Sequence, residues 1–237
     1  MSTLPPLKSF SLTHILYDPA HPLSIPLTLL SLSPIFLFVS YFTLLIFTRR
    51  LTIALLAGGQ LVNEVLSWAL KRIVKEGRPY TGHGELSTGY AWPSSHAQAA
   101  GFLVAWGLGY AWTMDKRSTK LRSQSSETIR RWRTGIYVLG LIAWSVGVSY
   151  SRYHLHYHSP SQIVAGYLVG NGYGALHFLL SEYYPLYHST SLLARLRRGV
   201  EYVWEGIGGV GGWNLGDAQG GWGEGWMLAE EADKKRT

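Results

Sequence analysis

Five long apolar runs, separated by polar segments, constrain the fold of this chain more than any other feature. Each run is close to the roughly 20 residues that an α-helix needs to cross a hydrocarbon core about 30 Å thick. A spanning segment must satisfy its own backbone hydrogen bonds, which helices do. The predicted spans are Ser24–Phe47, Leu51–Leu70, His96–Met114, Thr134–Tyr150 and Gln162–Leu180. The sequence therefore predicts an all-α, polytopic membrane bundle of about five to six transmembrane helices.

The segments around these runs complete the expected organisation. A sixth span has two weaker candidates, Leu7–Leu16 and Leu186–Val203, neither long and apolar enough to be predicted with the others. The N-terminal segment lacks the basic flank and apolar core of a cleavable signal peptide, so we expect the first membrane helix to be retained. The expected regions are an N-terminal non-cytoplasmic segment (1–23), a membrane-embedded domain (24–180) and a C-terminal cytoplasmic region with a Gly/Trp-rich tail (181–237).

Basic residues are divided unevenly between the two sides of the predicted bundle. With five spans, six Lys and Arg residues fall on the side of the loops Lys71–Ser95 and Ser151–Ser161, and fifteen fall on the other side. Lys and Arg accumulate on the cytoplasmic side of membrane proteins. This predicts a cytoplasmic C-terminus and places the two loops in the opposite compartment. The excess of basic residues behind the formal charge of +7 is thus explained by membrane topology. No nucleic-acid partner is expected, because no basic patch stands apart from the spans.

The last residues of the chain suggest a compartment. Lys234 and Lys235 stand three and four places from the end and resemble the dilysine retrieval signal of endoplasmic reticulum membrane proteins, which a coat complex recognises. The alternative, a solvated charged tail, stays open. If the signal operates, the two loops face the lumen of the reticulum.

The first chemically informative block is Lys71-x6-Arg78-Pro79. Seven residues are close to two helical turns, so both cations lie on one face if the second helix continues past the membrane edge. Pro79 would then end that continuation, because the residue before a proline disfavours helix. An arginine fork and a lysine point charge together suit a phosphate group. Simple anchoring to lipid headgroups is the alternative.

The second block, Pro93-Ser94-Ser95-His96, opens the third predicted helix. A helix N-terminus offers free N–H groups to an anion, and the serine hydroxyls add donors. His96 can hold a proton for a departing oxygen. The same serines can also cap the helix, which is compatible with phosphate binding.

The third block is Ser151-Arg152-x5-His158. Arg152 supplies a third cation, and an imidazole such as His158 can attack phosphorus directly. With His154 and His156, a metal site is an alternative. However, the spacing His-x-His-x-His puts three imidazoles on one face only if the segment is an extended strand, and the loop has no carboxylate to serve as a further ligand. The chain contains no cysteine, which excludes thiolate chemistry, and no metal is expected.

In this order the blocks resemble those of the type 2 phosphatidic acid phosphatase superfamily of integral-membrane lipid phosphatases, over roughly Lys71–Gln162. The superfamily pattern is Lys-x6-Arg-Pro, Pro-Ser-Gly-His and Ser-Arg-x5-His-x3-Asp. The resemblance implies that His158 is the nucleophile and His96 the acid for the leaving group, with no cofactor. It also implies a phosphate cradle made of Lys71, Arg78, Ser94, Ser95 and Arg152.

Two positions depart from that pattern. Ser95 stands in place of the glycine, and Gln162 in place of the aspartate. Gln162 can orient His158 through its carbonyl, or it can complete a capping box with Ser159 as N-cap and Pro160 at the first helical position; both interpretations remain open. Serine and glutamine at these positions look like the dolichyl diphosphatase branch of the superfamily.

That resemblance implies a function. Enzymes of this branch convert dolichyl diphosphate to dolichyl phosphate on the lumenal face of the reticulum, which recycles the lipid carrier for N-glycosylation, through a phosphohistidine. The expected partners are therefore a polyisoprenoid diphosphate and the bilayer. The alternatives are a phosphatase for phosphatidate or a sphingoid phosphate, and a non-catalytic scaffold, which only Gln162 suggests.

Small residues and one carboxylate mark two helix faces. Gly166, Gly170 and Gly174 recur every four residues on the last predicted span, a pattern typical of close helix packing, with a lipid groove as the alternative. Glu64 lies about two turns before Lys71 on the same face; a membrane carboxylate is a functional candidate, and pairing with a cation is equally compatible.

Overall fold

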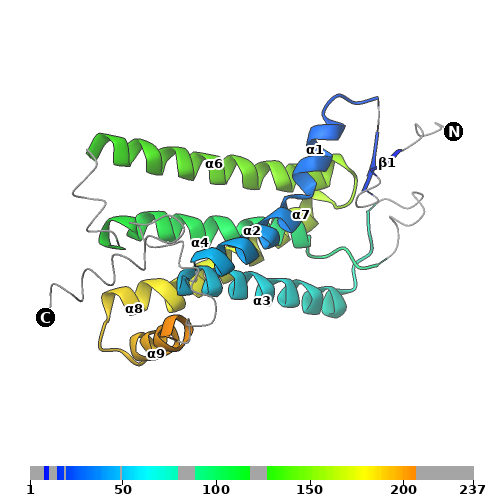
Figure 1. The fold of residues 1–237 in the computed structure, drawn as a ribbon. Coiled ribbons are helices and arrows are strands. Elements are labelled where there is room, and N and C mark those ends of the chain that lie inside the picture. Colours follow the sequence, from blue (N-terminus) through cyan, green and yellow to red (C-terminus); the bar gives the residue numbers. More distant parts are fainter. Residues whose placement is uncertain are drawn as a thin grey trace, which may run out of the picture. The chain divides into compact units, whose positions relative to one another are not determined.

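The computed structural model describes residues 8–10, 15–18, 20–48, 50–79, 89–117 and 127–206. The Gly/Trp-rich tail after Gly206 and the dilysine candidate Lys234-Lys235 lie outside these residues. Within them the chain is helical apart from two short strands and the connections (Figure 1). The helices are α1 (Ser24–Ser31), α2 (Ser33–Thr48), α3 (Leu51–Val74), α4 (Ser95–Arg117), α6 (Glu127–His154), α7 (Pro160–Phe178), a π-helical turn η2 (Leu179–Tyr183), α8 (Tyr184–Tyr187) and α9 (Leu192–Gly206).

Four helical stretches are long and apolar enough to cross a membrane: Ser24–Thr48, Leu51–Val74, Glu127–His154 and Pro160–Tyr187. They coincide with four of the five predicted spans. Large apolar side chains on them are exposed, for example Leu139 at 69% and Leu168 at 65%. Such continuous apolar surface is the expected outside of a bundle in lipid. The chain is thus an all-α, multi-pass membrane protein, as predicted.

The remaining predicted span, His96–Met114, forms α4 and is not among these four stretches. Its 23 residues nevertheless give a length of roughly 35 Å, enough to cross a hydrocarbon core. It packs against both α7 and α6 (Figure 1), so its surface meets protein rather than lipid and is not required to be strongly apolar. Small or aromatic side chains of α4 are buried to 1% exposure or less: Ala97, Ala99, Ala100 and Phe102.

The first predicted span is broken. It forms two helices, with a turn at Leu32 between α1 and α2. Pro34 explains the break, because proline has no N–H and fits only the first turn of a helix, where no intrahelical partner is needed. A new helix therefore starts at Ser33 instead of the old one continuing.

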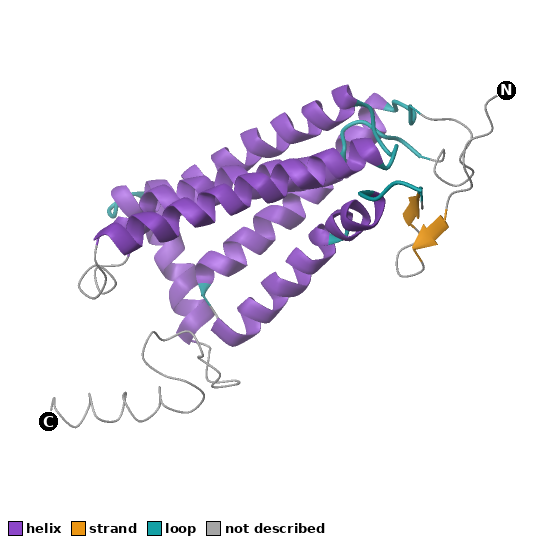
Figure 2. Ribbon diagram, turned by 90° about the horizontal axis from the view of Figure 1, so that it is seen from above, coloured by secondary structure: helices purple, strands orange, loops and turns teal. Residues whose placement is uncertain are grey.

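Neither weak candidate for a sixth span is a membrane helix. Residues of the first form two antiparallel strands, β1 (Lys8–Phe10) and β2 (Ile15–Tyr17), seen beyond the helix ends in Figure 2. Ile15 packs with Leu155 and Tyr157. The second candidate contains α9, whose 15 residues are too few to cross a bilayer.

The chain divides into two compact units. The first comprises residues 1–35 and 59–179, and it contains all three motif blocks. Its centre is the contact between α4 and α7. A Cβ atom added at Gly166 would lie 2.5 Å from the carbonyl oxygen of Ser94, just before α4, and one at Gly174 would lie 2.5 Å from that of Phe102 in α4. A Cβ atom at Gly170 would collide with the Gln98 carbonyl. The glycine face is therefore filled by the α4 backbone: close packing is confirmed, and the lipid groove is wrong for this face.

A polar contact also joins helices inside this unit. The buried Gln98 amide on α4 donates to both the backbone and side-chain oxygens of Asn63 on α3, at 2.9 and 3.0 Å. Interhelical amide contacts of this kind hold membrane helices together where there is little apolar driving force between them. On the same helix, Glu64 accepts a hydrogen bond from Gln60 at 3.5 Å.

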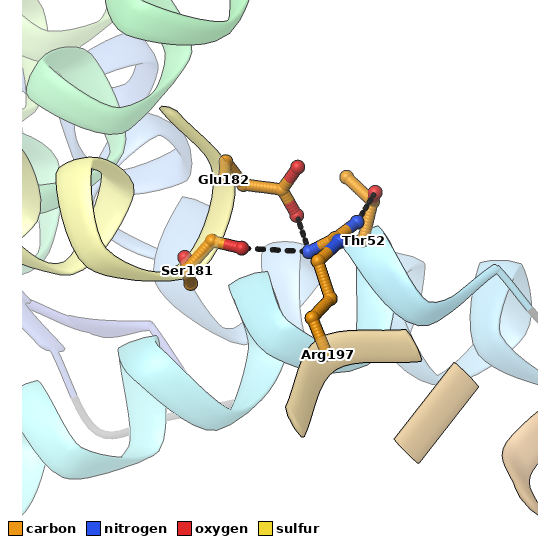
Figure 3. A network of polar contacts seen from close by, with 4 residues as sticks. All are labelled: Thr52, Ser181, Glu182 and Arg197. Carbon is orange, nitrogen blue, oxygen red and sulfur yellow. Dashed lines mark hydrogen bonds and ion pairs between the residues drawn. The ribbon is translucent and has the colours of Figure 1, made fainter. Parts of the chain in front are cut away.

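The second unit comprises residues 36–58 and 180–237. Its described part is organised around Glu182, which is 1% exposed. Arg197 of α9 donates to this carboxylate at 2.8 Å and to the Ser181 carbonyl at 2.7 Å, and its other nitrogen reaches the Thr52 hydroxyl at 3.3 Å (Figure 3). A buried carboxylate is tolerated when it is paired and hydrogen-bonded in this way. Arg197 therefore has a structural role.

Candidate active site

The three sequence blocks meet at one end of the first unit. The Lys71 amine at the end of α3 donates to the Ser95 hydroxyl at 2.5 Å. The backbone N–H of Ser94 donates to the Gln162 carbonyl at 3.1 Å. Arg78 donates to the Tyr157 carbonyl at 3.3 Å. Each block is thus joined to another by a direct hydrogen bond, as their expected shared role requires.

Arg78 reaches the site by a route that differs from the expected one. The expected continuous helix from Lys71 to Arg78 is wrong, because α3 ends at Val74. Lys75 takes a left-handed backbone conformation (φ 55°) and its N–H bonds to the Lys71 carbonyl at 3.0 Å, which closes the helix. The next residues then form a loop that carries Arg78 back over the site, so Pro79 does not end the helix.

Arg152 is the most enclosed of the three cations, at 5% exposure. Its guanidinium donates to the Ser31 hydroxyl at 2.6 Å and lies 4.0 Å from the centre of the Tyr157 ring. Within the described part of the chain, neither Lys71 nor Arg152 forms an ion pair. No direct ion pair therefore neutralises these two cations among the described residues, and both can attract an anion.

Two buried donors of the site have no protein partner. Among the described residues, nothing lies within hydrogen-bonding distance of the Ser94 hydroxyl or of the Arg152 Nε atom. A buried polar group without a partner costs about 1–3 kcal/mol, so such groups are usually satisfied by a ligand or water. Beside them α4 begins at Ser95, and the N–H groups of its first turn have no partner inside the helix. Together these donors make a cradle suited to a phosphate.

His158 lies between the end of α6 and the start of α7 and is 3% exposed. Its Nδ1 atom is 3.3 Å from the Gln162 side-chain oxygen. That oxygen also accepts from the Ser159 N–H at 3.2 Å, while the Gln162 nitrogen donates to Glu76 and to the Gly77 carbonyl. These partners leave one orientation for the amide. Its oxygen then accepts from Nδ1–H, and the lone pair of His158 lies on Nε2.

Burial and charge keep His158 neutral. Burial, and after it the nearby cations Arg152, Arg78 and Lys71, together lower the pKa of the His158 imidazole to about 3, although the hydrogen bond to Gln162 acts in the opposite direction. An ordinary histidine titrates near pH 6.5. At physiological pH the Nε2 lone pair is therefore free to act as a nucleophile.

Gln162 makes the contacts that both of its possible roles require. Ser159 is the N-cap of α7, with a complete capping box to Gln162 and Pro160 in the first turn. The oxygen that accepts from the N-cap backbone also accepts from His158. The capping contacts therefore hold in place the same amide oxygen that contacts the imidazole.

The other histidines separate into two groups. His96 is hydrogen-bonded to the backbone of Ser31 and interacts electrostatically with His158 and Arg152, which places it in the cradle. His154 instead stacks edge-on against His21 at 4.6 Å. In the part of the chain that the structure describes, no group of three His, Asp or Glu side chains is placed to hold a metal ion.

Three site residues were not predicted. Ser31 and Tyr157 hold Arg152 from either side, and Glu76 bonds to Gln162 at 2.7 Å. Ser31 lies in an apolar run with no distinguishing pattern. Tyr157 precedes the proposed nucleophile, and Glu76 is the single acid between Lys75 and Arg78, so both offered a weak signal.

Comparison with known proteins agrees with this geometry. The model of the PAP2 superfamily matches residues 50–184, more than half of the chain. Dolichyldiphosphatase 1 of Homo sapiens is 35% identical over 176 residues, which cover 74% of this chain and 72% of the human protein. Dolichyldiphosphatase of Saccharomyces cerevisiae is 32% identical over 181 residues, 74% of this chain and 71% of the yeast protein. No solved structure matches the chain significantly.

The matched region contains the whole phosphate cradle together with His96, His158 and Gln162, from Lys71 on α3 to Gln162 on α7. Ser31, which contacts Arg152, lies outside it. The human and yeast relatives match over more than two thirds of their own length. The chain therefore belongs to the PAP2 superfamily and, within it, to the dolichyldiphosphatase family.

Proposed function

We propose that this protein removes the terminal phosphate of dolichyl diphosphate and releases dolichyl phosphate and inorganic phosphate. The observation that carries the proposal is the buried, neutral imidazole of His158, oriented by Gln162 and surrounded by Lys71, Arg78 and Arg152. The diphosphate as substrate rests on the similarity to the human and yeast dolichyldiphosphatases. In this role the enzyme would return the lipid carrier to protein N-glycosylation.

In the first step, the His158 Nε2 lone pair forms a bond to the terminal phosphorus while the bond from phosphorus to the bridging oxygen breaks. The electron pair of that bond goes to the bridging oxygen, which takes a proton from His96. The negative charge of the bound diphosphate favours the protonated form of this imidazole before the reaction. The three cations and the Ser94 hydroxyl stabilise the charge on the equatorial oxygens. Dolichyl phosphate leaves, and a phosphohistidine remains.

In the second step, a water molecule attacks the phosphohistidine. His96, now neutral, takes a proton from the water, and the electron pair of the phosphorus–nitrogen bond returns to Nε2. Inorganic phosphate leaves, and both histidines are restored. Gln162 keeps Nδ1–H in place throughout, since its oxygen accepts from His158 and its nitrogen has acceptors of its own.

The substrate class and the source of charge can be tested together. We expect the purified, detergent-solubilised protein to release phosphate from dolichyl diphosphate faster than from dolichyl monophosphate or phosphatidate, and to do so with a chelator present. The reason is that side-chain cations supply the charge that a metal ion supplies in other phosphatases. Phosphate release from the three lipids, measured side by side, checks this.

The other outcomes separate the alternatives. Preference for phosphatidate would keep the mechanism and change the substrate class. Loss of activity on chelation would contradict the side-chain mechanism. No turnover of any lipid phosphate would leave a non-catalytic scaffold as the remaining interpretation. The neutral imidazole of His158 and its contact with Gln162 favour catalysis over that interpretation.

We also propose that the protein resides in the endoplasmic reticulum, with the site on the lumenal face and the C-terminal region in the cytoplasm, where the coat complex could read Lys234-Lys235. The charge distribution supports this. Because the chain has no cysteine, single cysteines report topology cleanly. In intact microsomes, a membrane-impermeant maleimide should label Thr190→Cys at once and the exposed His156→Cys only after permeabilisation. The reverse order would invert the topology.

A further inference from the structure

The link between Gln162 and Glu76 joins two segments 86 positions apart in the chain. Gln162 is 1% exposed, and its amide is fully engaged. On one side its oxygen accepts from His158 Nδ1 and from the Ser159 N–H. On the other side its nitrogen donates to a Glu76 carboxylate oxygen at 2.7 Å and to the Gly77 carbonyl at 3.1 Å. A continuous hydrogen-bonded chain therefore runs from the carboxylate to the imidazole.

We propose that Glu76 is a positioning residue for the nucleophile, which acts on His158 through the Gln162 amide and takes the place of a carboxylate in direct contact with the imidazole. The proposal rests on the proposed phosphohistidine mechanism. In the superfamily pattern an aspartate stands at the position of Gln162. Here the negative charge lies one hydrogen bond further away.

The chemistry of the amide explains how this works. A hydrogen bond from the amide nitrogen to a carboxylate shifts electron density toward the amide oxygen, because hydrogen bonds in a chain polarise one another. That oxygen then accepts more strongly from Nδ1–H. When Nε2 bonds to phosphorus, the imidazole gains positive charge, and the strengthened bond stabilises it. A neutral amide without Glu76 would orient the ring but would stabilise this charge less.

The local structure holds Glu76 in position. The left-handed conformation of Lys75 ends α3 immediately before it, and the Glu76 carbonyl accepts from the Ala91 N–H at 2.8 Å. The loop is therefore fixed on both sides. Residue Glu76 is nevertheless exposed to solvent, so its charge is partly screened. The expected effect is accordingly smaller than that of removing a buried catalytic group.

The test is Glu76→Gln, which keeps the shape and an acceptor oxygen and removes only the charge. We expect kcat on dolichyl diphosphate to fall about tenfold, the difference between a charged and a neutral hydrogen-bond partner, with KM unchanged. The exchange Glu76→Gln with Gln162→Glu, which puts a carboxylate directly on Nδ1, should restore most of kcat. Glu127→Gln, which removes an exposed carboxylate paired with Arg131, is the matched control and should leave kcat unchanged.

A readout without substrate separates this proposal from the mechanism on which it rests. The Nδ1 proton of His158, observed by NMR in labelled protein, should move upfield in Glu76→Gln and stay in place in Glu127→Gln. A wild-type kcat in Glu76→Gln, or an Nδ1 proton whose chemical shift does not change, would overturn the proposal that Glu76 acts on His158 through Gln162. If the wild-type protein turns over no lipid phosphate, the proposed function fails, and the NMR result alone decides whether Glu76 acts on His158.

Discussion

Replacing His158 by alanine is expected to reduce phosphate release from dolichyl diphosphate by about four orders of magnitude or more, because losing a nucleophile costs nearly all chemical catalysis. The cradle of Lys71, Arg78 and Arg152 remains in the variant, so substrate should still bind. Steady-state phosphate release and the affinity for a non-hydrolysable diphosphate analogue measure the two effects separately. Little change in affinity is expected.

His156→Ala is the matched control. It removes the same side-chain type two positions away, from an exposed site, and should keep wild-type activity. Brief reaction of the wild-type protein with substrate labelled in the terminal phosphate should leave an acid-labile, base-stable label on His158 alone. Appreciable turnover by His158→Ala in a correctly folded preparation would contradict the assignment of His158 as the nucleophile.

Gly170→Ala should strongly destabilise the protein. The added Cβ would collide with the Gln98 carbonyl and lie 2.8 Å from its carbonyl carbon and 2.9 Å from the Phe102 nitrogen. Overpacking a core usually costs about 1–3 kcal/mol, and backbone atoms cannot move aside as side chains do. We therefore expect a loss of about 3 kcal/mol or more in unfolding free energy, seen as a much lower melting temperature in detergent.

The same variant should also lose activity. The face of α7 that carries Gly170 sets the distance to α4. His96 lies in the first turn of α4, and His158 precedes α7. Forcing the helices apart separates the acid from the nucleophile. Gly172→Ala is the control: nothing lies within 4 Å of its added Cβ, and alanine favours helix by about 1 kcal/mol over glycine. Its melting temperature should stay or rise; equal losses in both variants would contradict this account.

The lengths of the apolar runs were a good guide to the helices because the bilayer requires a local property, about 20 apolar residues in succession. Four spans meet that criterion in the structure. The third predicted span, which forms α4, does not meet it. Its surface is surrounded by protein, so it needs small residues such as Ala97 and Ala100 more than apolar ones, and only packing explains why it belongs to the bundle.

Helix ends were harder to predict than helix centres. A lysine in a left-handed conformation is not visible in the sequence, so Lys75 gave no sign that α3 stops at Val74. Pro34, by contrast, carries a backbone restriction that a sequence does show, although the break at Leu32 was not predicted. The capping box at Ser159 was foreseen and is present, because its residues are close in sequence and interact locally.

For the site, the sequence by itself determined the chemistry: three cations, two histidines and the hydroxyls, identified by order and spacing, predict a phosphate cradle wherever the chain places them. The tertiary structure decided which groups control them. Ser31 meets Arg152 across 121 positions and Glu76 meets Gln162 across 86. Contacts this distant depend on how helices pack, and no local pattern encodes them. That is why the sequence suggests the proposed nucleophile, whereas the carboxylate proposed to act on it emerges only from the tertiary structure.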